Sequence, residues 1–224
     1  MIRSRSRGAW LPLLSGFAVA FAVAGCGGKP PTIAAVEWRL ESRPADEGAY
    51  ESLSAFAWVK AEDGIENIDE VWVVHDESAM GWRLTDSDWI KTPEGSDAWI
   101  GGSALAAPDF KPLPRGTWRM IALDASGQRA EREFSVLGSF PSRPTPSLTL
   151  SSGSLTASSS WPETLALAFD ATGAQAGSVA APAGSARLED LFGTDAAGRA
   201  NEVALYGYDP SQRMGAFSRR VSTR

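Results

Sequence analysis

The sequence predicts an all-β protein with two antiparallel β domains, of which the first is a β-sandwich and the second is smaller. Several short segments alternate apolar and polar residues with a period of two, the pattern of half-buried strands. Turn-forming residues separate these segments, and no long helical pattern lies between them. The chain has 224 residues, of which 43% are hydrophobic and 21% charged, so it can bury a core.

The first domain is predicted over residues 33–137. Its strands are recognised by alternation, except for one apolar run at residues 71–74 that is rich in β-branched residues and is typical of a central strand. The tryptophans in alternating segments are expected in the core; they are Trp38, Trp58, Trp72 and Trp118. The predicted strands lie at residues 36–41, 54–59, 71–74, 117–124 and 133–136.

A proline-rich segment, residues 138–146, is predicted to be a linker, because its three prolines disfavour a regular ladder. Residues 147–224 would form the smaller β domain, with one short helical turn within residues 186–192. Its main strands are expected near residues 164–170, 203–208 and 214–221.

A four-residue turn pattern recurs three times, beginning at Asp124, Asp170 and Asp195. Asp caps the backbone of a turn and Gly three residues later accepts a positive φ, so each copy is predicted to close a hairpin. The repeats fit either a duplicated module or turn chemistry alone.

The N-terminus has the pattern of an export signal. Three arginines precede an apolar segment, residues 11–24, that is too short and too interrupted for a membrane span of about 20 residues. The segment ends in Val23-Ala24-Gly25-Cys26, which resembles the lipobox of bacterial lipoproteins, with Val in place of the usual Leu. The resemblance implies that residues 1–25 are a signal peptide, that Cys26 is lipidated, and that residues 26–32 hold the lipidated Cys and a tether.

The lipid on Cys26 is the only cofactor expected, and it makes a membrane the first partner. Two or three acyl chains such as palmitate, at ~0.8 kcal/mol per buried CH₂, anchor a protein stably. Cys26 is the sole cysteine, which excludes an intrachain disulfide framework. Gly27 is not the Asp that retains some lipoproteins at the inner membrane, so the expected location is the cell envelope, with the outer membrane favoured where there are two.

Charge argues against one class of partner. The whole chain has a net charge of −6, and without residues 1–25 it keeps 18 basic and 27 acidic side chains, a net charge of −9. Nucleic-acid binding needs clustered Lys and Arg against phosphates, so no nucleic-acid partner is expected.

Residues 116–136 resemble the last two strands of bacterial immunoglobulin-like and fibronectin-III-like modules. The likeness rests on Gly116-Thr117-Trp118-Arg119, the turn Asp124-Ala125-Ser126-Gly127, and Phe134-Ser135-Val136. It implies an immunoglobulin-like sandwich. The wider layout, a lipobox followed by a Trp-rich β domain and a smaller β domain, is similar to uncharacterised spirochaetal lipoproteins. Such modules host many functions, so neither resemblance implies an activity.

Two tryptophans are the candidate ligand-contact residues. Trp89 and Trp99 flank the sequence Pro93-Glu94-Gly95, and a three-residue hairpin loop would pair Thr92 with Ser96 and Trp89 with Trp99. The two indoles would then share one face and suit a sugar ring, a peptide or a partner protein. A two-residue loop would put them on opposite faces, and packing in the core is the competing interpretation.

An acidic stretch between residues 62 and 70 contains three weak Ca²⁺ candidates, Asp63, Glu66 and Asp69. Loops at the edge of β-sandwiches can hold Ca²⁺ with carboxylate oxygens. The spacing does not match the EF-hand pattern. A solvated loop is therefore expected, and no metal.

These observations predict a non-enzymatic binding or scaffolding module, anchored by lipid in the cell envelope, with an envelope protein or glycan as partner. One alternative is a carbohydrate-binding module that uses exposed Trp. Another is a hydrolase of envelope polymers with a carboxylate pair. The single histidine, His75, has Asp76 and Glu77 beside it but no accompanying nucleophile motif, so it is expected to satisfy a turn at a strand end.

Overall fold

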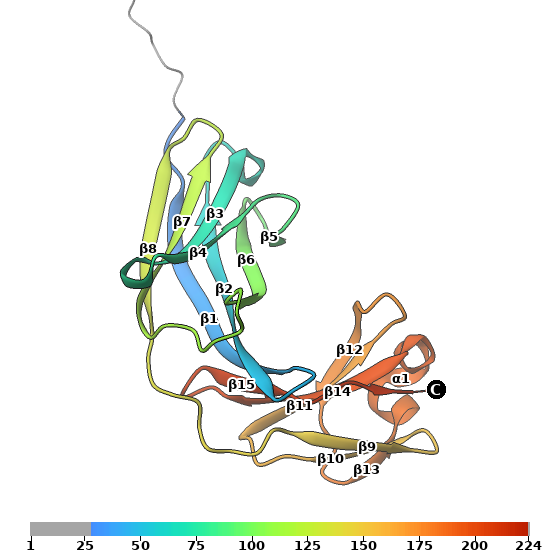
Figure 1. The fold of residues 1–224 in the computed structure, drawn as a ribbon. Coiled ribbons are helices and arrows are strands. Elements are labelled where there is room, and N and C mark those ends of the chain that lie inside the picture. The colour runs from blue at the N-terminus through green and yellow to red at the C-terminus, as the bar shows by residue number, and fades with distance from the viewer. Residues whose placement is uncertain (1–27, 224) are drawn as a thin grey trace, which may run out of the picture.

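A computed structural model describes residues 28–223, which form three β-sheets and one α-helix (Figure 1). The predicted signal peptide and Cys26 lie outside the described residues. The strands of the first region are β1 (Thr32–Pro44), β2 (Ala49–Lys60), β3 (Ile68–His75), β4 (Met80–Leu84), β5 (Ile90–Glu94), β6 (Asp97–Ala106), β7 (Gly116–Asp124) and β8 (Arg129–Val136). The second region contains β9 (Ser147–Ser151), β10 (Ser154–Ser158), β11 (Glu163–Phe169), β12 (Gln175–Ala180), β13 (Ser185–Arg187), α1 (Leu188–Arg199), β14 (Glu202–Asp209), β15 (Met214–Phe217) and β16 (Val221–Ser222).

The first region is an antiparallel β-sandwich, and the all-β prediction is confirmed. One layer has the strand order β1-β2-β6-β5 and the other β4-β3-β7-β8. Alternate residues of each layer point inward, and together they form one core. Its fully buried side chains include Leu40, Leu53, Ile100, Val71, Val73, Trp118 and Met120.

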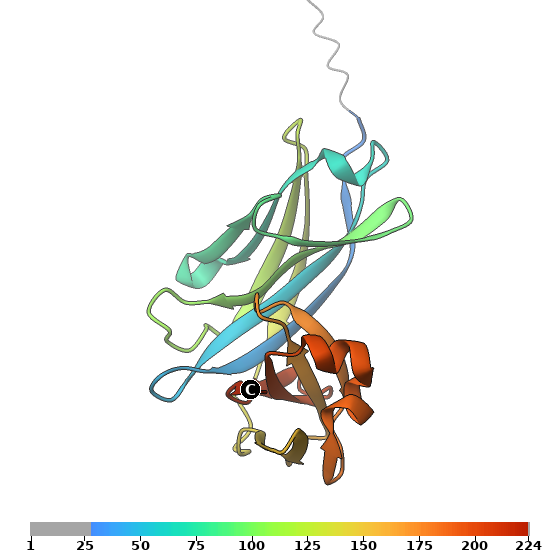
Figure 2. The same ribbon diagram turned by 90° about the vertical axis from the view of Figure 1, so that its right-hand side faces the viewer.

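One sheet runs through both regions. β1 pairs with β2 on one side and, in parallel, with β15 on the other, where Leu40 lies opposite Met214 and Glu41 opposite Gly215. The sandwich layer therefore continues into β15, β14, β11 and β12. The sheet bends where β1 meets β15, which gives the molecule the L shape of Figure 1, and Figure 2 looks into the inner side of that bend. We call the bend the elbow.

The second region covers the outer side of its half of the sheet with the three-stranded sheet β13-β10-β9 and the helix α1. α1 is longer than the single turn predicted, and it is broken at Gly193, whose φ is 77°. Asp195, predicted to begin a hairpin turn, instead lies in α1 and forms an ion pair with Arg199 one turn later (3.1 Å). Within the described residues, no helix is both long and apolar enough to cross a membrane.

The other two copies of the turn pattern do close hairpins, as predicted. Asp124 Oδ1 accepts hydrogen bonds from the backbone nitrogens of Ser126 (2.9 Å) and Gln128 (2.8 Å). Asp170 Oδ1 accepts the same pair of bonds from Thr172 (2.9 Å) and Ala174 (3.0 Å). Each carboxylate thereby organises its turn locally.

The segment between β8 and β9, predicted as a linker, is held by the second region. Trp161 donates from Nε1 to the Pro144 carbonyl (3.1 Å), and Arg143 forms an ion pair with the nearly buried Asp209 (3.0 Å). Trp161 lies directly over Gly207, where a Cβ atom would come within 2.4 Å of the ring. These contacts fix the segment beside β14, next to the elbow.

Candidate functional site

Aromatic side chains gather on the inner side of the continuous sheet. In β2, Ala55 and Ala57 point into the core, so Phe56 and Trp58 point away from it. In β14, Val203 and Leu205 face the opposite way from the residues between them. We call this inner surface the concave face; its large apolar side chains are Phe56, Trp58, Ile90, Trp99, Leu167, Phe169, Tyr206, Tyr208 and Phe217.

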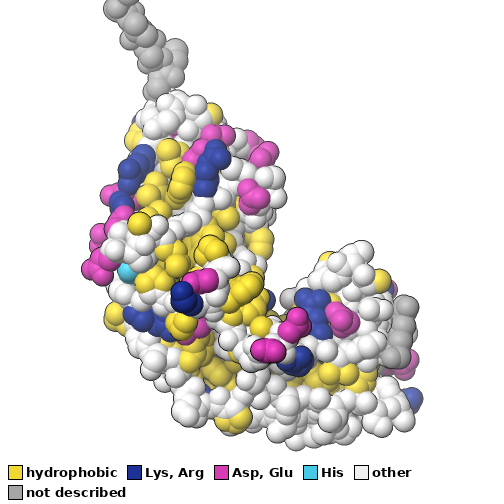
Figure 3. Space-filling model, viewed as in Figure 1, with side chains coloured by type: hydrophobic (Ala, Val, Ile, Leu, Met, Phe, Trp, Pro, Cys, Tyr) yellow, Lys and Arg dark blue, Asp and Glu magenta, His cyan; other side chains and the backbone are white. Residues whose placement is uncertain are grey.

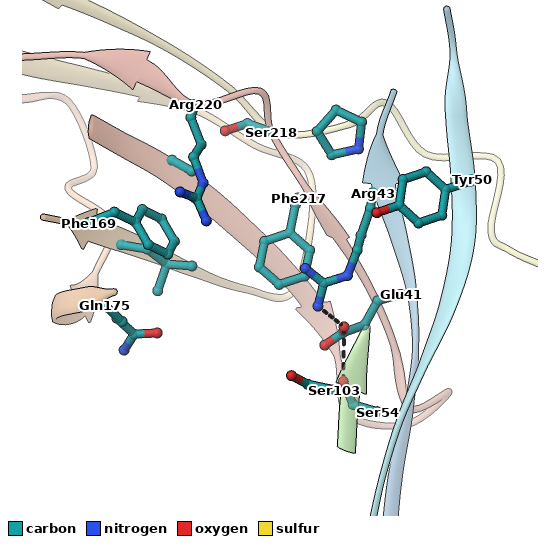
Figure 4. Close-up of a pocket in the computed structure, with 13 residues that line it drawn as sticks. Glu41, Arg43, Tyr50, Ser54, Ser103, Phe169, Gln175, Phe217, Ser218 and Arg220 are labelled. Atoms are coloured by element: carbon teal, nitrogen blue, oxygen red, sulfur yellow. Dashed lines mark hydrogen bonds and ion pairs between the residues drawn. The ribbon is translucent and has the colours of Figure 1, made fainter. Parts of the chain in front are cut away.

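A cavity of about 450 Å³ opens at the elbow, within the concave face (Figure 4). Phe217 lies in its middle, between side chains from the two regions. The space-filling view shows the hollow from the side, with acidic and basic side chains near its floor (Figure 3). The lining from the first region includes Glu41, Arg43, Tyr50, Ser54 and Ser103, and that from the second includes Phe169, Gln175, Phe217, Ser218 and Arg220.

Three guanidinium groups lie over aromatic rings on this face. Such cation–π contacts contribute about 0.5–1 kcal/mol each at exposed sites. A guanidinium over a ring can still donate its N–H groups to other partners, as Arg43 does to Glu41 and Ser52. The pairs are Arg39 over Tyr208 (4.8 Å to the ring centroid), Arg43 over Phe217 (4.4 Å) and Arg220 over Phe169 (3.7 Å).

One carboxylate, that of Glu41, is buried beside the cavity, with 5% of the residue exposed. It accepts hydrogen bonds from Arg43 Nη2 (2.6 Å) and Ser54 Oγ (3.1 Å). Arg43 Nε also donates to Ser52 Oγ (2.8 Å). A buried carboxylate is tolerated only when it is paired and hydrogen-bonded in this way, so the network fixes Arg43 at the cavity wall.

A glycine makes room for a tyrosine at the base of the elbow. The ring of Tyr206 lies over Gly215, where a Cβ atom would come within 2.4 Å of the hydroxyl oxygen. Burial, and secondarily the Glu41 carboxylate, raise the pKa of this hydroxyl, so it stays protonated. Arg39 approaches the same hydroxyl and opposes part of this rise in pKa.

A β-bulge between β2 and β6 shapes the wall formed by the first region. The register shifts between Leu53 and Ala55, and the strands approach so closely that a Cβ atom at Gly101 would lie 2.0 Å from the Ala55 carbonyl oxygen. Ala104 takes a positive φ of 59° in the same bulge. The extra residue in β6 brings the exposed Ser103 to the cavity, as bulges commonly do beside binding sites.

The predicted pairing of Trp89 with Trp99 is wrong. Glu94 lies opposite Asp97, so the hairpin closes with a two-residue turn whose first position is Gly95 with φ 65°, as in type II′ turns. Trp89 precedes β5 and packs against the core of the sandwich. Trp99 lies on the concave face, which is the outcome expected of a two-residue loop.

Trp99 has a different aromatic partner, Trp58. The two residues pair across β2 and β6, with ring centroids 5.3 Å apart and planes at 60°. The core placement predicted for Trp58 and Trp72 is therefore wrong, since both point to outer faces, whereas Trp118 is fully buried and Trp38 packs against the core. The sequence contained a signal for the outward position of Trp58: it alternates with the small residues Ala55 and Ala57, which fit the interior.

The acidic stretch is not assembled as a cation site. Glu66 forms an ion pair with Lys91 (2.6 Å), and the described residues contain no cluster of three or more His, Cys, Asp or Glu that could hold a metal, Asp63 and Asp69 included. His75 is 2% exposed, and its Nδ1 accepts from the Ser78 backbone nitrogen (3.3 Å). It satisfies a turn at the end of β3, as predicted.

No protein-family model and no curated protein matches the chain. Among solved structures, the chain is similar to Tp47, the 47-kilodalton lipoprotein of Treponema pallidum, with a TM-score of 0.41 and 15% identity over 86% of this chain; the match spans 50% of that protein's length. It is also similar to a chimeric titin Z1Z2 tandem, with a TM-score of 0.25 and 19% identity, covering 84% of this chain and 96% of that one. Both similarities are too distant to carry a function over to this chain.

Proposed function

We propose that this protein is a lipid-anchored binding module of the bacterial cell envelope, and that it holds its ligand on the concave face at the elbow without transforming it. The observation that carries this proposal is the elbow cavity, whose walls come from both regions of one continuous sheet. Arginines lie over aromatic rings at this cavity, and the bulge in β6 directs Ser103 toward it. Both are features of a surface adapted to a ligand.

The position of the cavity supports an anchored role. Residue 28, the first described, lies at the end of the sandwich farthest from the elbow (Figure 1). β1 has 13 residues and runs between the two ends, a length of about 40 Å at ~3.3 Å per residue. An anchor on Cys26 would therefore leave the concave face clear of the membrane.

The chemistry of the cavity favours binding over hydrolysis. Glycosidases need two carboxyl groups across the substrate, one of which must be able to hold a proton. Among the described residues that line the cavity, Glu41 is the one carboxylate, so the lining does not supply the second carboxyl group that hydrolysis needs.

The binding proposal is tested by filling the cavity. The body from residue 27 would be mixed with washed, insoluble envelope particles and sedimented, with Ser103→Trp as the variant that obstructs the cavity. Ser135→Trp is the matched control, because Ser135 is also an exposed strand serine but lies on the other layer, in β8. We expect co-sedimentation that Ser103→Trp abolishes and Ser135→Trp preserves. Equal retention of both variants would contradict a ligand site at the elbow.

The anchor is tested separately, with the full chain. Cys26→Ala should move the protein from the membrane fraction to the soluble fraction and abolish labelling by a palmitate analogue. A variant that remains in the membrane fraction without label would contradict lipid anchoring at this residue.

A further inference from the structure

The concave face presents a continuous track of ligand-contact groups. It begins at the Trp58–Trp99 pair, passes Phe56 opposite Gly101, and reaches Ser54, which lies opposite Arg39. Beyond these residues it opens into the cavity. From Trp58 to Ser52, the residue opposite Glu41, β2 covers about 20 Å at ~3.3 Å per residue. The track therefore suits an elongated ligand, such as a short oligomer, rather than a single small molecule.

The rings and the polar groups along this track suit a sugar chain. Indole and phenyl faces stack on the C–H face of a sugar ring, and a partly exposed Trp offers such a face at little cost in mobility. Gly101, opposite Phe56, is buried and adds no side chain to this face. The exposed Ser103 and Gln175 offer hydroxyl and amide groups to sugar hydroxyls.

An extended peptide fits this face less well. Peptides that join a sheet do so at an edge, where backbone N–H and C=O groups are unpaired. The strands beneath the track, β15, β1, β2 and β6, each have a hydrogen-bonded neighbour on both sides. At the elbow, where β1 pairs with β15 over Leu40–Ser42, the concave face therefore offers side chains rather than a backbone ladder.

The guanidinium groups add a preference for negative charge. Arg43 pairs with Glu41 and Arg220 with Glu202 (3.1 Å), whereas Arg39 is exposed and has no ion pair within the part of the chain that the structure describes. A planar guanidinium held on a ring presents a pair of N–H donors that matches a carboxylate.

We propose that the concave face binds a glycan strand bearing carboxylate groups, with Trp58 and Trp99 stacking a sugar ring and Arg39 and Arg220 pairing with carboxylates at the elbow. This inference rests on the proposed binding function and names its ligand class. Carboxylated sugars occur both in uronic-acid polysaccharides and in muramic-acid glycans, and the chemistry recognised is the same.

The test measures affinity by calorimetry and by Trp fluorescence, using the body from residue 27 at low salt. The probes are oligogalacturonate, the same oligomers after reduction of their carboxyl groups, peptide-free muramic-acid glycan strands, and poly-glutamate. We expect at least one carboxylated glycan to bind, and at least tenfold weaker binding of the reduced oligomer. A preference for one carboxylated probe over the other identifies the source. Binding should weaken with added salt, because ion pairs at an exposed site are screened.

Matched variants test the aromatic part of the track and the arginines separately. Trp99→Ala should weaken binding of the carboxylated probe about tenfold, whereas Trp72→Ala, an outward-facing Trp on the opposite layer, should leave it unchanged. Arg39→Gln combined with Arg220→Gln should weaken the carboxylated probe and leave the reduced oligomer unaffected. Arg129→Gln, in β8, is the matched control. Thermal unfolding of each variant verifies that it is folded.

Three outcomes would overturn the inference. Equal binding of the reduced oligomer would refute carboxylate recognition, and equal binding of poly-glutamate would refute the sugar contacts of the Trp pair. Failure of all four probes, while the Ser103→Trp variant still abolishes retention by envelope particles, would reject this ligand class and leave the binding function standing. Loss of both signals would reject the binding function as well.

Discussion

The two outer faces of the sandwich differ in what their charged side chains contact. On the layer formed by β3, β4, β7 and β8, Arg119 contacts both Asp76 (2.7 Å) and Glu131 (2.8 Å), and Arg83 pairs with Glu70. On the concave face, arginines lie over aromatic rings and Trp58 packs against Trp99. The first face satisfies its charges with each other, as a solvated surface does. The second face also contains ion pairs such as Arg43–Glu41, but it places several arginines over aromatic rings, which is why we assign the ligand to it.

The largest expected difference between the faces concerns their carboxylates. Glu41→Ala should lower the free energy of unfolding by about 2–4 kcal/mol, because it leaves the charge of Arg43 without its partner at a largely buried site. Arg43 is partly exposed, so the loss should lie at the lower end of the range for buried ion pairs. Glu131→Ala, on the other face, should cost no more than about 1 kcal/mol. Urea denaturation of both variants measures the two losses, and equal losses would remove the distinction between the faces.

A smaller difference is expected from crowding beneath the concave face. Gly215→Ala should destabilise by about 1–3 kcal/mol, because its methyl group would collide with the Tyr206 ring. Gly184→Ala is the control, since nothing lies within 4 Å of a Cβ atom there and its φ is not positive. Thermal unfolding compares the two. A Gly215→Ala variant as stable as the control would show that Tyr206 can leave the elbow without cost.

Acid should weaken the ion pairs on the other face, and this effect is the smallest. The hydrogen bonds from Arg119 lower the pKa of Asp76 below its ordinary value. A lowered pKa in the folded state means that the pair stabilises the fold above the ordinary carboxyl pKa of about 3.9, and that this contribution is lost as the pH falls through the folded-state value. Asp76→Asn should therefore show a smaller fall in Tm than the wild type between pH of about 6 and about 3. An identical fall in the two proteins would contradict the role of this pair.

Local sequence patterns were sufficient to predict most strands, but not which strands pair with one another in the sheets. The alternation in residues 117–124 correctly predicts β7 and the burial of Trp118 and Met120, because each strand's faces follow from its own sequence. The parallel pairing of β1 with β15 joins residues far apart in the chain, and no local pattern encodes it. The elbow cavity depends on that pairing, so its lining could not be assembled from the sequence.

The hairpin register shows a second limit. Gly95 satisfies the positive φ of either a three-residue loop or a two-residue turn, and the sequence of the turn does not decide between them. A shift of one residue exchanges the faces of a strand. The observed pairing of Lys91 with Ile100 puts Trp89 on the core side of β5 and leaves Trp99 on the concave face.

The course of β1 has a mechanical consequence. One end of this strand lies near residue 28 and the other reaches the elbow, and between them β1 is hydrogen-bonded to β2 along its length and to β15 at its far end. A pull between residue 28 and a ligand held at the elbow would run parallel to β1 and across those hydrogen bonds. Bonds loaded in this direction share the force and must break together, so the fold resists tension along the line that joins its attachment point to its ligand.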